Sequence, residues 1–198
     1  EAGEVLTEEN ISNVYQTRVM IQKNPMTERP YVVMLPGSTT LINDNCDNNC
    51  LNKSKIHLIC GGGSGRNLLK KLYNTGYQLS CGVLNQGDSD WEMAVNLNIE
   101  VVDIPPFSFI DDKSKEYNIS LAKKADCIIL AETPFGRGNI ENLSILLGIN
   151  NTDIILYNSK PICERDYTGG RAVEYWNNII KHDNVSIVET EEELLSLI

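Results

Sequence analysis

The sequence predicts an α/β fold in which a three-layer, doubly wound parallel sheet of about six strands follows a short helix and a β-hairpin. From Lys55 onward, short apolar runs typical of buried strands alternate with amphipathic stretches typical of helices. The first of these strands leads directly into a cluster of glycines that opens a helix, which is the usual beginning of such a sheet.

The expected strands are rich in Val, Ile and Leu and lie at 56–60, 78–84, 99–103, 126–131, 153–157 and 185–188. The expected helices lie at about 65–75, 89–97, 113–124, 139–148 and 169–182, and a last helix begins at Glu191. This alternation predicts a parallel sheet that helices cover on both faces. The commonest strand order, 3-2-1-4-5-6, would place a ligand at the carboxyl ends of the strands, where the order reverses beside the first strand.

Residues 1–35 are expected to form a separate unit. Thr7 can cap a short helix through Tyr15, and acidic residues in its first turn favour that helix. Two β-like runs follow, at 17–21 and 31–35, and the polar segment between them predicts a hairpin.

Residues 36–54 are rich in Asn, Asp and Ser and lack apolar periodicity, so they are expected to link the first unit to a domain at 55–198. Cys46 and Cys50 in this linker could hold a metal ion only with two further ligands. The sequence supplies only His57 nearby, inside an expected strand. We therefore predict no metal site.

The composition excludes two classes of partner. The chain has 198 residues with a net charge of −10, whereas nucleic acids and anionic membranes require a basic surface. No apolar run approaches the roughly 20 residues that a helix needs to cross a bilayer. The scattered cysteines fit a reduced cytoplasm better than a disulfide framework.

The glycine cluster after the first strand is the leading candidate for a ligand-binding loop. Its backbone N–H groups, with the helix N-terminus behind them, suit an anion. The expected binding residues are Gly61, Gly62, Gly63, Ser64, Gly65 and Arg66. The loop matches neither a P-loop, which needs Lys after its last glycine, nor the dinucleotide pattern G-x-G-x-x-G. Alternatively, the glycines serve only to let strand and helix pack closely.

The loop after the second strand is acidic. Asn85 lies where nucleotide-binding domains place a ribose contact, and Asp88 and Asp90 could accept hydrogen bonds from hydroxyl groups. Trp91 could stack on a ring or pack against the sheet. Ser89 and Glu92 have the spacing of a capping box, so helix initiation explains part of this pattern.

Three further loops reach the same edge of the expected sheet. Phe107 and Phe109 after the third strand could form an apolar wall of a pocket, or could tuck their rings into the core. The fourth and fifth strands are followed by glycine-containing turns. Their expected ligand-binding residues are Thr133, Gly136, Arg137, Gly138, Asn139, Thr168 and Gly169. Arg137, at the tip of its turn, would complete an anion clamp with the first glycine loop.

Catalytic residues are not identified by the sequence. His57 and His182 are not placed near these loops, and no nucleophile with a neighbouring base is evident. Asp88, Asp90, Glu92 and Glu132 could transfer protons, but no spacing requires it.

The N-terminal unit carries a resemblance to a known family. Residues that match the family pattern in order are Gly3, Val5, Leu6, Thr7, Val14, Tyr15, Pro25, Arg29 and Pro30. On these residues the segment resembles the C-terminal end of ATP-binding subunits of ABC importers for iron–siderophore, haem and cobalamin. The chain contains no Walker A, Walker B or signature motif, so we expect ATP binding to lie upstream in a longer parent protein.

The second domain carries a looser resemblance. The runs GVLNQGDSDWE, PPFSFI, PFGRGN and YTGG are similar to accessory domains fused behind archaeal ATP-binding subunits of such importers. The domain also resembles Rossmann-like nucleotide-sensing and nucleotide-processing domains, including lysine-decarboxylase-like phosphoribohydrolases. Their Pro-Gly-Gly-x-Gly-Thr motif is not matched at residues 134–139, so their hydrolase chemistry is not carried over.

These resemblances imply an accessory, regulatory domain that binds a small molecule for an iron-chelate or cobalamin importer. It would contact membrane permease subunits through the parent ATPase, at the cytoplasmic face of the membrane, and a homodimer is left open. A Rossmann-like enzyme acting on a nucleotide or cofactor is the alternative, and a purely structural or dimerisation module is a third reading. The ligand is not identified; a nucleotide-like or other anionic compound fits the loops.

Overall fold

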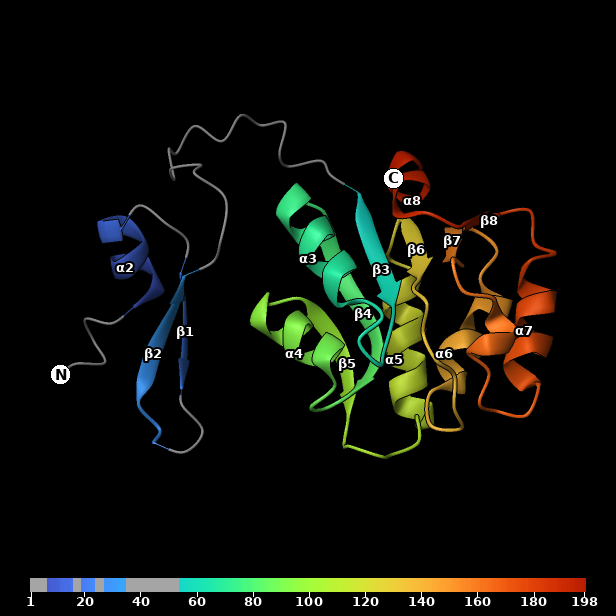
Figure 1. Ribbon diagram of the computed structural model, residues 1–198, viewed down its shortest axis with the longest axis horizontal. Coiled ribbons are helices and arrows are strands. Elements are labelled where there is room, and N and C mark those ends of the chain that lie inside the picture. Colours follow the sequence, from blue (N-terminus) through green and yellow to red (C-terminus); the bar gives the residue numbers. More distant parts are fainter. Residues whose placement is uncertain (1–6, 16–18, 24–26, 35–53) are drawn as a thin grey trace. The chain divides into compact units, whose positions relative to one another are not determined.

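The computed structural model describes residues 7–15, 19–23, 27–34 and 54–198 (Figure 1). Two compact units divide the chain, one within residues 1–51 and one within 52–198, and each is described by itself. Several sequence-based expectations lie outside the described residues: those for Gly3, Val5, Leu6 and Pro25, for Cys46 and Cys50, and for residues 36–53 of the linker.

The first unit contains the expected helix and hairpin. Helix α2 spans Glu8–Tyr15, and strands β1 (Val19–Lys23) and β2 (Pro30–Met34) pair antiparallel. The Thr7 hydroxyl accepts a hydrogen bond from the backbone N–H of Asn10 (3.2 Å), as expected of a helix cap.

The second unit is a six-stranded parallel sheet with helices on both faces (Figure 1). Its strands are β3 (Lys55–Ile59), β4 (Gln78–Asn85), β5 (Glu100–Ile104), β6 (Cys127–Leu130), β7 (Asp153–Tyr157) and β8 (Val185–Val188). Its helices are α3 (Arg66–Thr75), α4 (Ser89–Asn96), α5 (Asp112–Ala122), α6 (Ile140–Ser144), α7 (Arg171–Ile179) and α8 (Glu191–Ser196). The strand order β5-β4-β3-β6-β7-β8 is the predicted 3-2-1-4-5-6, so the expected α/β, Rossmann-like fold is confirmed.

Alternating residues of the central strands bury their side chains in opposite layers, because successive side chains of a strand point to opposite faces. Ile129 packs in the cluster that includes side chains of α3, α4 and α8, whereas Ile128 and Leu130 pack in the cluster of α6 and α7. All three side chains are fully buried. The parallel sheet is therefore covered on both faces, as its continuous apolar strands predict.

A buried chain of polar side chains joins the sheet to α5 and α6. His57 on β3 lies 2.9 Å from Ser80 Oγ through Nδ1 and 2.9 Å from Asn118 Oδ1 through Nε2. Asn118 Nδ2 in turn donates to Asn142 Oδ1 (2.9 Å). Desolvation lowers the pKa of His57 to about 4, so the imidazole is neutral at pH 7.

The chain of side chains ends at a bulge in β4. The pairing register between β4 and β5 shifts between Cys81 and Val83, which leaves Gly82 as the extra residue. Asn142 accepts from the backbone N–H of Val83 (3.1 Å) and donates to its carbonyl (2.7 Å). A Cβ at Gly82 would lie 3.4 Å from the Oδ1 atoms of both Asn118 and Asn142, so glycine leaves room for the two amides.

Helix boundaries depart from expectation near the glycine turns. The expected helix at 139–148 divides into α6 and a 3-10 turn at Ile145–Gly148. The expected helix at 169–182 is shorter and begins at Arg171. Asp88, and not Ser89, is the N-cap of α4. Within the described ranges, no helix combines the length and apolarity needed to cross a membrane.

Candidate functional site

The glycine-rich loop packs tightly against its surroundings. A Cβ at Gly65 would lie 2.4 Å from Cys60 Cβ, which is closer than atoms can approach. Gly62 has φ +65°, and a Cβ there would lie 2.9 Å from Pro134 Cγ. Close packing, the simpler of the two sequence-based interpretations, therefore accounts for these two glycines by itself.

Two acidic side chains already bind the N–H groups of this loop. Asp88 Oδ2 accepts from the N–H of Gly62 (2.8 Å), and Asp90 Oδ2 accepts from the N–H of Gly65 (3.1 Å). The N–H of Gly61 donates to the Ser64 hydroxyl (3.3 Å). Carboxylates of the protein thus hold N–H groups that we expected an anionic ligand to bind.

The end of β4 and the first turn of α4 contain buried polar atoms without partners. Asp90 is fully buried, and burial, assisted by the charge of Asp88, raises its pKa although the N–H of Gly65 opposes the rise. Among the described residues, Asn85 Oδ1, Asp90 Oδ1 and Trp91 Nε1 are buried without a hydrogen-bond partner. Unpaired buried polar atoms are uncommon and call for an explanation, such as a water molecule or a ligand group.

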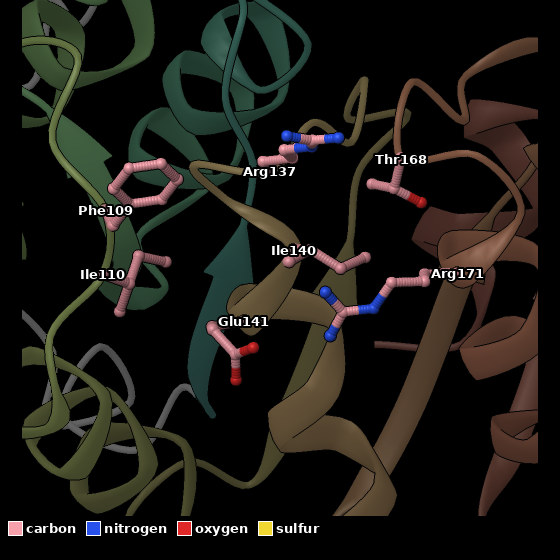
Figure 2. A pocket seen from close by; sticks show the side chains of 7 residues that line it. All are labelled: Phe109, Ile110, Arg137, Ile140, Glu141, Thr168 and Arg171. Carbon is pink, nitrogen blue, oxygen red and sulfur yellow. The ribbon is translucent and has the colours of Figure 1, made fainter.

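A pocket of about 520 Å³ opens among the loops that follow β5, β6 and β7 (Figure 2). Its lining residues are Phe109, Ile110, Arg137, Ile140, Glu141, Thr168 and Arg171. Arg137 and Thr168 were expected to bind ligand from sequence, whereas Ile110, Ile140, Glu141 and Arg171 were not. The glycine-rich loop, Asn85, Asp88 and Asp90 are not part of this lining.

Phe135 holds two of the pocket loops together. It is fully buried and forms a parallel bridge with Asp166, in which its N–H donates to the Arg165 carbonyl and its carbonyl accepts from Tyr167, both at 2.8 Å. This bridge places the Arg137 turn beside Thr168, although about 30 residues separate them in the chain.

Asn139 fixes the shape of the Arg137 turn. Its Oδ1 accepts from the N–H of Gly136 (2.8 Å), and its Nδ2 donates to the Pro134 carbonyl (2.9 Å). The side chain therefore folds back onto its own turn, and it makes no capping bond to α6. Arg137 projects from the tip of the turn and is exposed.

Thr168 and Asp166 cap the start of α7. The Thr168 hydroxyl donates to Asp166 Oδ1 (2.6 Å) and accepts from the N–H of Ala172 (3.0 Å). Desolvation opposes ionisation of Asp166, but hydrogen bonds from Thr168 and Val173 hold its pKa below the ordinary value. These contacts explain why α7 begins later than expected, and they leave the Thr168 hydroxyl one unused lone pair. Gly169, which precedes the helix, has φ +82°.

The pocket is positively charged. Arg171 donates to the Tyr175 hydroxyl (3.0 Å) and stacks over its ring, while Arg137 has no hydrogen-bond or ion-pair partner within the described part of the chain. Glu141 forms an ion pair with Lys115, and this contact lowers the pKa of the carboxyl group. Glu141 and Glu174 also act on the charge of Arg171, so the excess of positive charge at the pocket comes mainly from Arg137.

Arg165, which the sequence did not indicate, joins the loops beneath this site. Its side chain is 5% exposed and donates to the carbonyls of Lys160 (3.0 Å), Thr133 (3.4 Å) and Ala131 (3.5 Å) and to Asn158 Oδ1 (2.9 Å). Desolvation lowers its pKa. No sequence signal distinguishes it from an exposed arginine, because its acceptors are mostly backbone carbonyls of distant loops.

The alternative that Phe107 and Phe109 tuck into the core is wrong. Both side chains are exposed, and Phe109 lines the pocket. The core contact of this loop comes instead from Ile110, which packs against a cluster of β4, β5 and α5 side chains.

The fold and the pocket define an α/β domain of the Rossmann-like type with a cationic cavity at the carboxyl edge of its sheet. Residues 79–195 match the model of the MJ0874 family, and the chain belongs to this family.

Curated relatives of the chain include the cobalamin import ATP-binding protein BtuD from two strains of Halobacterium salinarum. Each is 27% identical over 108 residues, which is 54% of this chain and 25% of the relative. The chain therefore spans about a quarter of the length of these relatives.

Solved structures with some likeness include two proteins of low identity. AtPrR2 in its apo form has a TM-score of 0.41 at 16% identity, covering 65% of this chain and 45% of its own. MurG of Acinetobacter baumannii has a TM-score of 0.39 at 12% identity, and the likeness covers 70% of this chain and 42% of MurG.

Proposed function

We propose that this chain is the regulatory, small-molecule-binding part of an ATP-binding protein that serves an ABC importer for iron chelates or cobalamin. The observation that carries the proposal is the pair Arg137 and Arg171, which reach one pocket from the turn after β6 and from the start of α7, in a chain whose net charge is −10. The similarity to a cobalamin import ATP-binding protein supports the transport context.

The pocket has the size and chemistry of a site for a small anion-bearing molecule. Ligand pockets span roughly 300–1,000 Å³ and combine apolar walls with a few polar groups. Here Ile110 and Ile140 supply apolar surface, and the guanidinium groups of Arg137 and Arg171 suit a carboxylate or phosphate. The Thr168 hydroxyl already donates its hydrogen to Asp166, so in this geometry it can accept one further hydrogen bond but cannot donate one.

The proposed organisation follows the sequence. Residues 1–35 would be the end of the ATPase subunit, 36–54 a polar linker and 55–198 the regulatory domain. ATP would bind upstream in the parent protein, and ligand binding to the domain would alter ATP turnover and hence transport. The parent would dock on permease subunits at the cytoplasmic face of the membrane.

Thermal unfolding of this chain with candidate ligands tests the proposal. Hydroxocobalamin, ferric citrate, ATP and inorganic phosphate would each be added at millimolar concentration. We expect at least one to raise the unfolding midpoint, since a ligand at 100 times its Kd stabilises by about 2.7 kcal/mol. Arg137→Gln and Arg171→Gln should reduce that shift, whereas Lys70→Gln, an exposed charge on α3, should leave it unchanged.

Two outcomes would contradict the proposal. One is the absence of stabilisation by all four compounds. The other is a stabilisation that Arg137→Gln and Arg171→Gln leave intact. A shift that only Arg66→Gln reduces would instead place the ligand at the glycine-rich loop, because Arg66 is exposed at the start of α3.

An enzyme acting on a nucleotide or cofactor is a second candidate, favoured by the unpaired atoms Asn85 Oδ1 and Asp90 Oδ1. These acceptor atoms are buried, so a nucleoside hydroxyl or amine could donate to them only if the start of α4 moves; the raised pKa of Asp90 suits a proton donor. Turnover in a nucleotide panel that Asp90→Asn abolishes, and that Arg137→Gln leaves intact, would favour this candidate over the first.

A further inference from the structure

The three phenylalanines of the protein divide unequally between core and surface. Phe135 is fully buried, whereas Phe107 is completely exposed and Phe109 is 70% exposed. Phe107 and Phe109 lie two residues apart on the loop between β5 and α5. Exposed aromatic side chains that gather in one place often mark a binding surface.

The backbone of this loop is held in an unusual conformation. Phe107 has φ +61°, a region that bulky side chains rarely adopt and that costs roughly 1–3 kcal/mol. The N–H of Ser108 donates to the Pro105 carbonyl (3.2 Å), and Ile110 packs against the core cluster. The loop is thus anchored on both sides of its aromatic residues, and the backbone strain accompanies their exposure.

The loop lies directly beside the positively charged turn. A Cβ at Gly138 would lie 3.5 Å from the Ser108 carbonyl oxygen, so the backbone after Arg137 contacts the backbone between the two rings. Figure 2 shows the Phe109 ring across the pocket from Thr168 and Arg171, with Arg137 between the two sides. An aromatic face and two guanidinium groups therefore border the same cavity.

We propose that the pocket takes an aromatic anion, whose flat ring lies against Phe109 and whose carboxylate or phosphate binds Arg137 and Arg171. This inference rests on the proposed ligand site and specifies its ligand class. Stacking on an aromatic side chain contributes about 1–3 kcal/mol, which is comparable to a hydrogen bond to a charged group. An anion without a ring loses the stacking contribution, and an uncharged ring loses the hydrogen bonds to the guanidinium groups.

The size of the pocket selects a small molecule as the occupant. A cavity of about 520 Å³ falls within the usual range for small-molecule sites, whereas protein partners typically cover about 800 Å² of flatter surface. Phe107 is exposed and is not part of the pocket lining. It would provide further apolar surface if the ring of the ligand projects beyond Phe109.

Three matched compounds test the inference with this chain. 1-Naphthyl phosphate carries both a ring and an anion, inorganic phosphate carries only the anion, and 1-naphthol carries only the ring. We expect titration calorimetry to show that 1-naphthyl phosphate binds at least about tenfold tighter than either of the others, as stacking of this size implies.

Single variants separate the two contributions. Phe109→Ala should weaken 1-naphthyl phosphate about tenfold and leave inorganic phosphate unchanged, because only the ring contact is lost. Arg137→Gln should weaken both phosphates about tenfold or more. Val95→Ala, which removes an exposed apolar side chain on α4, is the matched control and should change neither.

The outcomes distinguish the inference from the proposed function. If inorganic phosphate binds as tightly as 1-naphthyl phosphate and both depend on Arg137, the aromatic ligand class is wrong and the anion site stands. If neither phosphate depends on Arg137 or Arg171, the proposed site fails as well. If Phe109→Ala leaves 1-naphthyl phosphate unaffected, the exposed rings serve another surface, such as a protein contact, and the inference is overturned.

Discussion

Asp88 accepts a hydrogen bond from the backbone N–H of Gly62 at 2.8 Å, so a carboxylate of the protein holds the loop on which the sequence centres its anion site. The same side chain caps α4 by accepting from the N–H of Asp90 (2.8 Å). Asp88 therefore joins the end of β3 to the start of α4, and it does so with both carboxylate oxygens.

Replacement of Asp88 should destabilise the fold without affecting the pocket. We expect Asp88→Ala to lower the free energy of unfolding by about 1–3 kcal/mol, because it removes a helix cap and leaves the N–H of Gly62 unpaired. Urea denaturation measures the loss. Glu116→Ala, on the exposed surface of α5, is the control and should change stability by less than about 0.5 kcal/mol. A loss of 1-naphthyl phosphate binding in Asp88→Ala would contradict this separation.

Gly65 should be required for packing. A Cβ at this position would collide with Cys60, which directly follows the buried strand β3. We expect Gly65→Ala to cost about 1–3 kcal/mol, the usual range for an overpacked core. Gly148→Ala should be close to neutral, because a Cβ there would meet no atom within 4 Å. Equal stability of the two variants, measured by thermal unfolding, would show that the loop can move away from β3.

His57 should make the protein sensitive to acid. Its pKa is about 4 in the folded state and 6.5 when exposed, so between these values the unfolded chain binds a proton that the folded chain does not. Stability should therefore fall as the pH decreases from 6.5 to 4, by roughly 3 kcal/mol from this group. The raised pKa of Asp90 acts in the opposite direction, so a comparison with a His57 variant is needed.

His57→Gln isolates this contribution, because it removes the titrating group and retains a donor and an acceptor. Urea denaturation at several pH values between 7 and 4 should give a shallower pH dependence for the variant than for the unmodified protein. Parallel pH dependences would mean that His57 is protonated without cost, contrary to its complete burial.

Asn142 should contribute more to stability than a surface asparagine. Asn142→Ala leaves both backbone groups of Val83 and the amide of Asn118 without their partner. Since each unsatisfied buried group costs about 1–3 kcal/mol, we expect a loss of about 3 kcal/mol or more. Asn177→Ala, at an exposed position of α7, should be neutral or slightly stabilising by helix propensity. A similar result for the two variants would contradict the proposed role of the buried amides.

Much of the fold could be predicted because hydrophobic periodicity reports local burial. The apolar runs predicted all six strands of the second unit, and the common topology predicted their order. Helix ends were less predictable, since they depend on caps that form in three dimensions. The start of α7 illustrates this, because Asp166 and Thr168 together set it at Arg171.

The site was predictable only in part. Loop position on the sheet placed the turns of Arg137 and Thr168 at the same edge, and both residues line the pocket, whereas the glycine loop that was expected to face Arg137 does not. The sequence could not reveal that Asp88 turns back onto the glycine loop, because this depends on side-chain direction. Arg165 could not be identified in this way. Its buried guanidinium group donates to backbone carbonyl groups, and such contacts leave no periodic pattern in the sequence. A ligand-binding role for any of these residues stays a prediction.

The bulge at Gly82 links two positions that are 60 residues apart in the chain. Gly82 leaves the space that Asn142 fills, and Asn142 satisfies the backbone that the bulge displaces. The two residues therefore depend on one another, and both also contact Asn118. Across related sequences the two positions should therefore change together, and a chain without glycine at 82 should have a regular strand and an apolar residue at 142.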